Sequence, residues 1–513
     1  MSFLFRSSLI VAIFFGLEKI LGFVRQVLIA RQFGLSPELD AFYAANNLPD
    51  LLFALISGGA LAIAFIPVLS EYLQLKGRPQ AWDLFSRITN LIFLLTAGLS
   101  ILIAIFAVPI VNSQIGIAPG FNAEQRLLVV DLMRLNLVAT LFFSISGLVM
   151  AGLQANQHFL LPAIAPSMYD VGTLFGVLIL APSTGFQIGP ITLPALGLGV
   201  YGLVYGVILG SILFLVVQIP GLIHFGFRWT PKINLHDPGV VQVLSLMGPR
   251  VLTVFFIQLI FIAQDNLASR VGEGSVTALV YGWLFMQVPE TLIGTALGTA
   301  LLPTLSEQIV RTETAQFKQT MNKVIRIILA LTIPGAVLLS IVIEPAVALL
   351  NFDAAGTQMV VWTSRAFMIG LVGQSLLEVA ARAFYARQDA RTPLITSSIT
   401  LIVFIILGVL LFRPLGTPGI ALANSLAFST EAVILLVLLN RRYEGVLEVR
   451  SSLLRIGLAT LAGALAATLV LALAPISSSI LVQLVAGSVA LGAGILVILP
   501  WIWRQELKSL VKL

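Results

Sequence analysis

Polar side chains that could bind an anionic ligand lie inside apolar stretches of this sequence. Basic groups can pair with phosphate oxygens, acids can hold the basic groups or a cation, and amides can donate or accept hydrogen bonds. Charges within apolar stretches are rare and usually face a cavity or a partner. The candidate site residues are Lys19, Arg25, Asp40, Asn47, Arg250 and Asp265. Two roles stay open for the basic residues: ligand binding, or pairing with Glu18, Asp40 or Asp265.

Local spacing predicts two ion pairs outside this set. Gln374, Glu378 and Arg382 follow one another at intervals of four residues, which places them on one helix face. We predict that Glu378 and Arg382 form a structural pair. Asp131 and Arg134 are three residues apart near the end of an apolar stretch and predict an interfacial pair.

The elements that must position these residues are membrane helices. Of the 513 residues, 58% are hydrophobic and 10% are charged, whereas soluble domains carry roughly 25% charged residues. The mean hydropathy is +1.03. Fourteen apolar runs, most of them long enough to cross a bilayer as a helix, predict an all-α polytopic membrane protein. The runs lie near residues 5–32, 38–72, 82–112, 126–155, 158–182, 197–223, 238–269, 276–309, 318–348, 357–388, 391–412, 417–440, 453–474 and 478–503. The first 23 residues lack a small-residue cleavage site, so we expect the first helix to be retained.

Basic residues gather in alternate loops between these runs. This bias predicts that both termini are cytoplasmic, which requires an even number of spans. The net charge of +6 therefore reflects membrane topology, and we expect no nucleic-acid partner.

One segment occurs twice in the chain. Residues 58–73 read GGALAIAFIPVLSEYL, and residues 294–309 read GTALGTALLPTLSEQI. ANQHFLLPA (155–163) likewise resembles ARQDARTPL (386–394). These matches lie six spans apart, so they predict parallel six-helix repeats around a central cavity, with two further helices. The predicted parts are an N-terminal lobe of six helices (1–224), a C-terminal lobe of six helices (225–442), and a C-terminal helix pair with a cytoplasmic tail (443–513).

The repeated segment contains candidate hinge residues. A proline within a helix removes a backbone hydrogen bond, and small residues beside it allow close packing or bending. The candidates are Gly58, Pro67, Gly294 and Pro303. A static kink is the alternative interpretation.

No catalytic or metal-binding arrangement is visible in the sequence. His158, His224 and His236 have no metal-ligand spacing, and the chain has no cysteine. GLGVYG (197–202) matches the dinucleotide fingerprint in letters, but no strand precedes it. We therefore expect a protein that is not an enzyme and has no metal or cofactor.

The N-terminal motifs resemble a known transporter family. KILGFVRQVLIARQFGLSPELDAFYAANNLPDLL followed by GGALAIAFIPVLSEY is similar to the signature of the MurJ (MviN) lipid II flippases. These belong to the multidrug/oligosaccharidyl-lipid/polysaccharide exporter superfamily. ALGTALLPTLSE and FYARQDARTP match the same family. The chain is identified as a divergent member, because arginines of the family pattern are replaced by Phe53 and Leu284.

The resemblance implies a function, a location and a partner. It implies alternating access that carries lipid II from the cytoplasmic to the outer leaflet of a bacterial plasma (inner) membrane. Two six-helix lobes would enclose a cationic cavity, and the last two helices would form a groove for the polyprenyl tail. Lys19 and Arg25 stand at basic positions of the family, Asp40 stands in its DAF motif, and Arg250 is a candidate to replace a missing arginine.

Other functions and couplings stay open at this stage. The alternatives are a flippase for another polyprenyl-linked oligosaccharide and a drug/cation antiporter of the same superfamily. A membrane glycosyltransferase or ligase is disfavoured because the outer loops are short and nearly uncharged. Coupling to the membrane potential or to a monovalent ion is possible in each transporter. Membrane lipids are expected partners, and a monomer is favoured.

Overall fold

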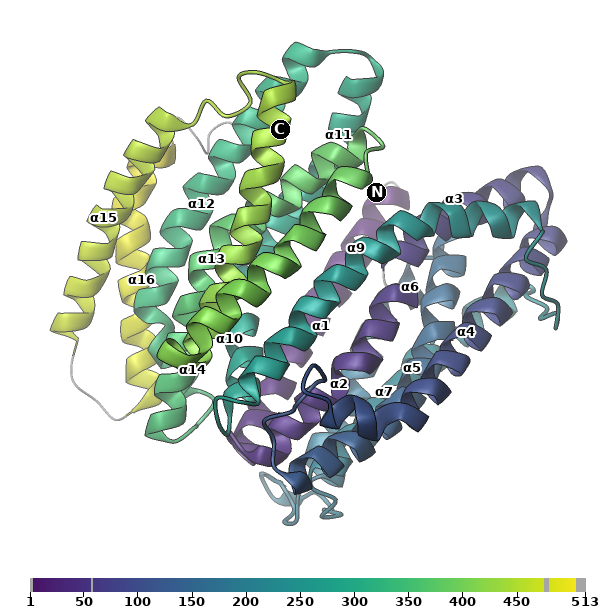
Figure 1. Ribbon diagram of the computed structural model, residues 1–513, viewed down its shortest axis with the longest axis horizontal. Coiled ribbons are helices and arrows are strands. Elements are labelled where there is room, and N and C mark those ends of the chain that lie inside the picture. Colours follow the sequence, from purple (N-terminus) through teal and green to yellow (C-terminus); the bar gives the residue numbers. More distant parts are fainter. Residues whose placement is uncertain (1–2, 57–58, 475–478, 504–513) are drawn as a thin grey trace. The chain divides into compact units, whose positions relative to one another are not determined.

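The chain forms two compact units, Met1–Asn266 and Leu267–Leu513 (Figure 1). The computed structural model describes residues 3–56, 59–474 and 479–503. Residues 225–266 are grouped with the first unit, whereas the sequence assigns them to a second lobe. The predicted division at 224 and 442 stays a prediction.

The first unit is built from long helices and a small hairpin. Its elements are α1 (Phe3–Phe33), α2 (Pro37–Ile56), α3 (Gly59–Leu75), α4 (Arg78–Asn112), α5 (Ala123–Ala155), α6 (Leu160–Phe175), the π-helical turn η1 (Gly176–Leu180), β1 (Gln187–Ile188), β2 (Ile191–Thr192), α7 (Val200–Val216), α8 (Ile219–His224) and α9 (Pro238–Ala268), whose last two residues belong to the second unit. The two strands pair antiparallel, with Gln187 opposite Thr192.

The second unit contains only helices among its described residues. These are α10 (Ser275–Glu290), the π-helical turn η2 (Thr291–Thr295), α11 (Ala296–Val310), α12 (Thr314–Ala348), α13 (Ala354–Ala386), α14 (Arg391–Arg442), α15 (Arg450–Leu473) and α16 (Ile480–Trp503). Within this unit α12 packs against α13, α15 and α16 (Figure 1).

The predicted helical membrane fold is confirmed, but the count of fourteen spans is not. Eleven helices among the described residues are long and apolar enough to cross a membrane. Helices satisfy their backbone polar groups internally, which a bilayer requires. The run 38–72 is divided between α2 and α3. The runs 391–412 and 417–440 both lie in α14, which bends at Gly416 with φ 61° and ψ −142°.

Glycines let α6 and the following turn η1 approach α7 closely. A Cβ atom on Gly172 would lie 2.3 Å from the Cα of Gly210, and one on Gly176 would lie 2.7 Å from the Cα of Gly206. Small residues at such spacing are typical of tightly packed membrane helices, where backbone contact replaces side-chain interdigitation. This contact fixes the positions of α6 and α7 relative to each other.

The two loops matched by sequence have the same backbone conformation. α5 ends at Ala155 and α13 ends at the matching Ala386. Two residues later, Gln157 has φ 59° and Gln388 has φ 58°, in the left-handed region that non-glycine residues rarely adopt. The internal repeat is therefore visible in geometry as well as in sequence.

Candidate functional site

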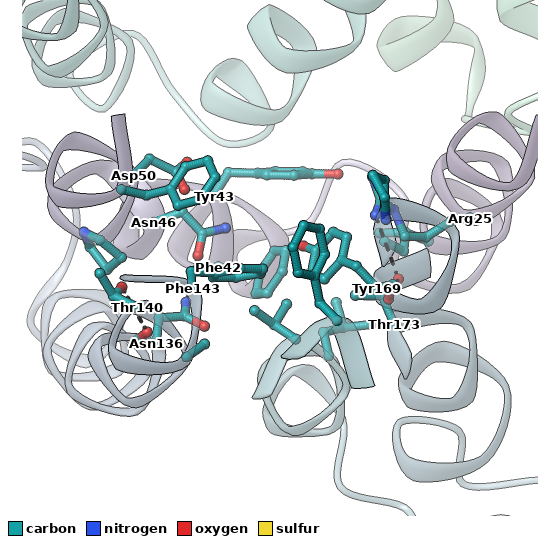
Figure 2. Close-up of a pocket in the computed structure, with 18 of the residues that line it drawn as sticks. Arg25, Phe42, Tyr43, Asn46, Asp50, Asn136, Thr140, Phe143, Tyr169 and Thr173 are labelled. Atoms are coloured by element: carbon teal, nitrogen blue, oxygen red, sulfur yellow. Dashed lines mark hydrogen bonds between the residues drawn. The ribbon is translucent and has the colours of Figure 1, made fainter. Parts of the chain in front are cut away.

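A pocket of about 330 Å³ lies inside the first unit, between α1, α2, α5, α6 and α7. Figure 2 shows Arg25, Tyr169 and Thr173 on one side of it, and Asn46, Asn136 and Thr140 on the opposite side. Arg25 is the one basic residue that the described part of the chain contributes to its lining.

Arg25 is held by an ion pair with α6. Its Nη1 donates a hydrogen bond to Asp170 Oδ1 at 2.6 Å and lies 3.5 Å from Thr173 Oγ1. The guanidinium carbon lies 5.4 Å from the centre of the Tyr169 ring. The Asp170 side chain is 3% exposed and that of Arg25 is 19% exposed. Arg25 therefore has a nearly buried anionic partner but remains accessible from the pocket.

The opposite side of the pocket carries amides. Asn136 Nδ2 donates to Asn46 Oδ1 at 2.5 Å. The buried Oδ1 of Asn136 receives no hydrogen bond from the described residues. Tyr43 of α2 donates its hydroxyl hydrogen to Gln26 Oε1 of α1 at 2.9 Å, which links this side to the helix that carries Arg25. This side can exchange hydrogen bonds with a neutral polar group.

Aromatic rings lie between the basic side and the amide side. The ring of Phe143 packs edge-on against Phe53 at 5.2 Å, Tyr169 at 5.5 Å and Phe214 at 5.8 Å between centroids. The sequence resemblance places Phe53 at an arginine position of the family, and here it contributes an apolar ring to the pocket lining. Two acids, Glu18 and Asp50, also line the pocket, which is therefore mixed in charge.

Among the predicted site residues whose side chains the structure describes, Arg25 alone lines this pocket. Lys19 is 58% exposed at its side chain, and its Nζ lies 3.3 Å from Glu18 Oε2. Lys19 therefore pairs with Glu18, one of the three acidic partners that the sequence left open for the basic residues. Asp40 is fully buried in the first turn of α2, where a carboxylate is favoured by the helix dipole.

Asn47 and Asp265 contact each other within the first unit. Asn47 Nδ2 donates to Asp265 Oδ2 at 2.7 Å and to the Ala44 carbonyl at 3.0 Å. Asp265 is 9% exposed. The backbone of Arg250 lies in α9, but its side chain is outside the described residues. The binding role of Arg250 therefore stays a prediction.

The hinge candidates lie in matching helices. Pro67 lies within α3 and Pro303 within α11, and both are exposed. Gly294 lies in η2, where an added Cβ would come within 2.7 Å of the Ser375 Cα. Gly58 is outside the described residues. The hinge role stays a prediction.

Of the two ion pairs predicted from local spacing, one is confirmed and the other is wrong. Glu378 and Arg382 form a salt bridge, and Arg382 also donates to Thr299 Oγ1 at 3.2 Å. Among the described residues Asp131 and Arg134 form no salt bridge. The Arg134 Nε instead donates to the Ala104 carbonyl of α4 at 3.0 Å, because α4 packs against α5 there.

Four residues at this pocket are not among the residues predicted from the sequence: Asn136, Tyr169 and Thr173, which line it, and Asp170, which holds Arg25. A signal for Asp170 was present, because it is the single acid in the apolar run 158–182. An isolated acid within such a run needs a partner. Its partner, Arg25, is 145 residues away in the chain, so spacing could not identify it.

Comparisons with known proteins agree with the motifs. A family model described as lipid II flippase MurJ matches residues 29–492. The lipid II flippase MurJ of Burkholderia cenocepacia is 32% identical over 450 residues, covering 86% of this chain and 84% of the relative. A probable lipid II flippase MurJ of Vibrio cholerae is 28% identical over 435 residues, covering 83% and 80%.

Solved structures share the fold. A lipid II flippase MurJ in an inward closed conformation superposes with a TM-score of 0.77 at 23% identity, covering 97% of this chain and 100% of that one. An inward-facing MATE family transporter of the MOP superfamily gives 0.68 at 12% identity, covering 84% and 95%. The family model and the Burkholderia cenocepacia relative show that the chain belongs to the MurJ lipid II flippase family.

Proposed function

We propose that this chain carries lipid II from the cytoplasmic to the outer leaflet of the bacterial inner membrane by alternating access. It acts as a transporter and not as an enzyme, as its family does. The observation that supports the site most directly is Arg25, the basic residue that reaches the pocket of the first unit.

Arg25 binds the pyrophosphate by exchanging partners. Its Nη1 is engaged by Asp170, while Nη2 and Nε have no hydrogen-bond partner among the described residues. A guanidinium can hold phosphate oxygens in a bidentate manner, and two negative charges compete well with one carboxylate. Release of the headgroup returns Arg25 to Asp170, so the empty pocket retains no uncompensated cation.

The neutral part of the headgroup binds across the rings and amides. A sugar presents apolar ring faces and hydroxyl groups, and the pocket offers aromatic rings beside amide and carboxylate side chains. The unfilled Oδ1 of Asn136 accepts a hydroxyl hydrogen in this arrangement. The same chemistry would suit another polyprenyl-linked oligosaccharide, which the experiment below distinguishes.

The membrane potential supplies energy for the cycle. Moving one elementary charge through 100 mV is worth about 2.3 kcal/mol, and the anionic headgroup carries charge across the membrane. Both termini lie in the cytoplasm, in keeping with the basic loops. Reporter fusions to each terminus test this orientation, and abolition of flipping by a potential-dissipating ionophore tests the coupling.

The decisive experiment uses a bacterial host depleted of its own lipid II flippase. The chain, its Arg25→Ala variant and an Arg311→Ala control are expressed to equal levels, and lipid II reachable by an external cleaving toxin is measured. Arg311 is a matched control because it is 63% exposed and pairs with Glu307 outside the pocket. We expect the parent and control to restore accessibility and Arg25→Ala to lose it. No restoration by an inserted, folded parent would refute lipid II as cargo.

A further inference from the structure

A second pocket, of about 690 Å³, lies in the second unit and contains an unusual arginine. Its lining comes from α12, α13 and α15, with α12 in contact with both other helices (Figure 1). The lining is apolar apart from Arg365, Ser340 and Thr468. This pocket shares no residue with the pocket of the first unit.

Arg365 uses only part of its hydrogen-bonding capacity within the protein. Its Nε donates to the Ser340 carbonyl at 3.0 Å, and its guanidinium carbon lies 5.0 Å from the centre of the Trp362 ring. Arginine has five N–H donors. The four on Nη1 and Nη2 have no hydrogen-bond partner among the described residues, and no described acid forms a salt bridge with Arg365. Glu344, which lies one turn beyond Ser340 on α12, likewise forms no salt bridge with Arg365.

The neighbouring hydroxyl groups do not compensate for this charge. The Ser340 hydroxyl donates to the Ala336 carbonyl at 2.6 Å, and the Thr468 hydroxyl donates to the Ala464 carbonyl at 2.9 Å. Among the described residues neither hydroxyl oxygen accepts a hydrogen bond from Arg365, whose Nε donates to the Ser340 carbonyl instead. A cation within an apolar membrane region normally requires a counterion or a path to water.

The depth of Arg365 is suitable for a lipid phosphate. α13 has 33 residues, so it is about 50 Å long at 1.5 Å per residue. Centred on a hydrocarbon layer about 30 Å thick, it extends about 10 Å beyond each boundary. Arg365 is 11 residues from Ala354, or about 16 Å along the helix, which places it about 6 Å inside the boundary. A guanidinium at this depth can reach the headgroup region.

The walls beside Arg365 are suitable for an acyl chain. Trp362 is 51% exposed, Ile369 57% and Val337 37%. They are contributed by α13 and α12 and line the same pocket as Arg365. An amphipathic molecule with one anionic group and an apolar chain matches both the charge and the walls.

We propose that this pocket is a binding site for an anionic glycerophospholipid of the surrounding leaflet. Its phosphodiester accepts hydrogen bonds from Nη1 and Nη2 of Arg365, and one acyl chain lies along Val337 and Ile369. One guanidinium neutralises one phosphodiester. A pyrophosphate-linked lipid would instead leave excess negative charge in an apolar groove, so the bound lipid is a resident of the membrane and not the cargo.

Native mass spectrometry of the full-length protein tests the site. The probes are phosphatidylglycerol and phosphatidylcholine, and the variants are Arg365→Gln, Arg365→Lys and Arg413→Gln. Arg413 is the matched control because it is an exposed arginine near the kink of α14, with its guanidinium carbon 5.7 Å from the centre of the Phe412 ring. We expect Arg365→Gln to weaken phosphatidylglycerol binding about tenfold, the scale of a charge-assisted hydrogen bond. Lysine should restore part of it, and Arg413→Gln should leave it unchanged.

Three results would overturn the proposal. These are equal binding of both lipids by the parent, equal losses in Arg365→Gln and Arg413→Gln, and displacement of phosphatidylglycerol from this pocket by a pyrophosphate-linked polyprenyl lipid.

Should Arg365→Gln fail to fold, Val337→Phe fills the pocket while keeping the charge, and it should also reduce phosphatidylglycerol binding. A thermal double-mutant cycle of Arg365→Gln with Glu344→Gln adds a fourth way to overturn the proposal, because strong coupling would identify Glu344 as the counterion of Arg365.

Discussion

Replacing Asp170 by asparagine separates the structural role of its ion pair from its role in binding. Removing one partner of a buried ion pair costs about 3–5 kcal/mol. In Asp170→Asn the remaining charge is Arg25, whose side chain is 19% exposed, so we expect about 3 kcal/mol. In Arg25→Ala the remaining charge is Asp170, whose side chain is 3% exposed, so we expect about 5 kcal/mol. Denaturant unfolding of the purified protein in detergent measures both losses.

The same two substitutions should change headgroup binding in opposite directions. Asp170 competes with the pyrophosphate for Arg25, so Asp170→Asn should bind lipid II about tenfold more tightly, whereas Arg25→Ala should bind it more weakly. Microscale binding measurements with lipid II compare the variants. Asp83→Asn is the control, because Asp83 pairs with Arg87 at 2.5 Å outside the pocket lining and should leave binding unchanged.

Two results would refute this reasoning. Weaker binding in Asp170→Asn would mean that Asp170 positions Arg25 for the ligand and does not compete with it. A stability loss below about 1 kcal/mol would mean that the pair behaves like a solvent-exposed salt bridge.

Three further predictions concern the first unit. Gly172→Ala should lower the free energy of unfolding by about 3 kcal/mol, because its Cβ would meet backbone atoms. Gly98→Ala is the control and should not destabilise the protein, because no atom lies within 4 Å of an added Cβ there. Thermal melts compare the two variants, and equal melting temperatures would contradict the prediction. Burial, and then the nearby charge of His224, lowers the pKa of His158 below 6.5. The folded state therefore resists protonation of His158. Its contribution to the free energy of unfolding is complete above pH 6.5 and falls as the pH drops towards the folded pKa. His158→Gln should flatten that slope in melting temperatures recorded between pH 7.5 and 5, and an unchanged slope would exclude His158 as its source. Asn47→Ala leaves a buried carboxylate on α9 without its 2.7 Å donor and should cost about 1–3 kcal/mol in denaturant unfolding; a neutral result would show that water replaces the amide.

The helical membrane class and the internal repeat could be predicted from the sequence because both depend on local chemistry. Apolar runs must become helices in a bilayer, since no other open structure satisfies the backbone. The matching loops at Gln157 and Gln388 repeat because the same residues end the preceding helices in the same way. The Glu378–Arg382 pair was also predictable, because its partners are one helical turn apart.

The pocket was decided only by tertiary packing. Arg25 and Asp170 are 145 residues apart, and Asn46 and Asn136 are 90 apart. Their contacts depend on how α1 and α2 pack against α5 and α6, which a one-dimensional pattern does not specify. Arg134 illustrates the same limit, because its Nε bonds to a carbonyl of α4 instead of the nearby Asp131. The sequence thus determined which charges must find partners within the membrane, and the helix packing determined which partners they found.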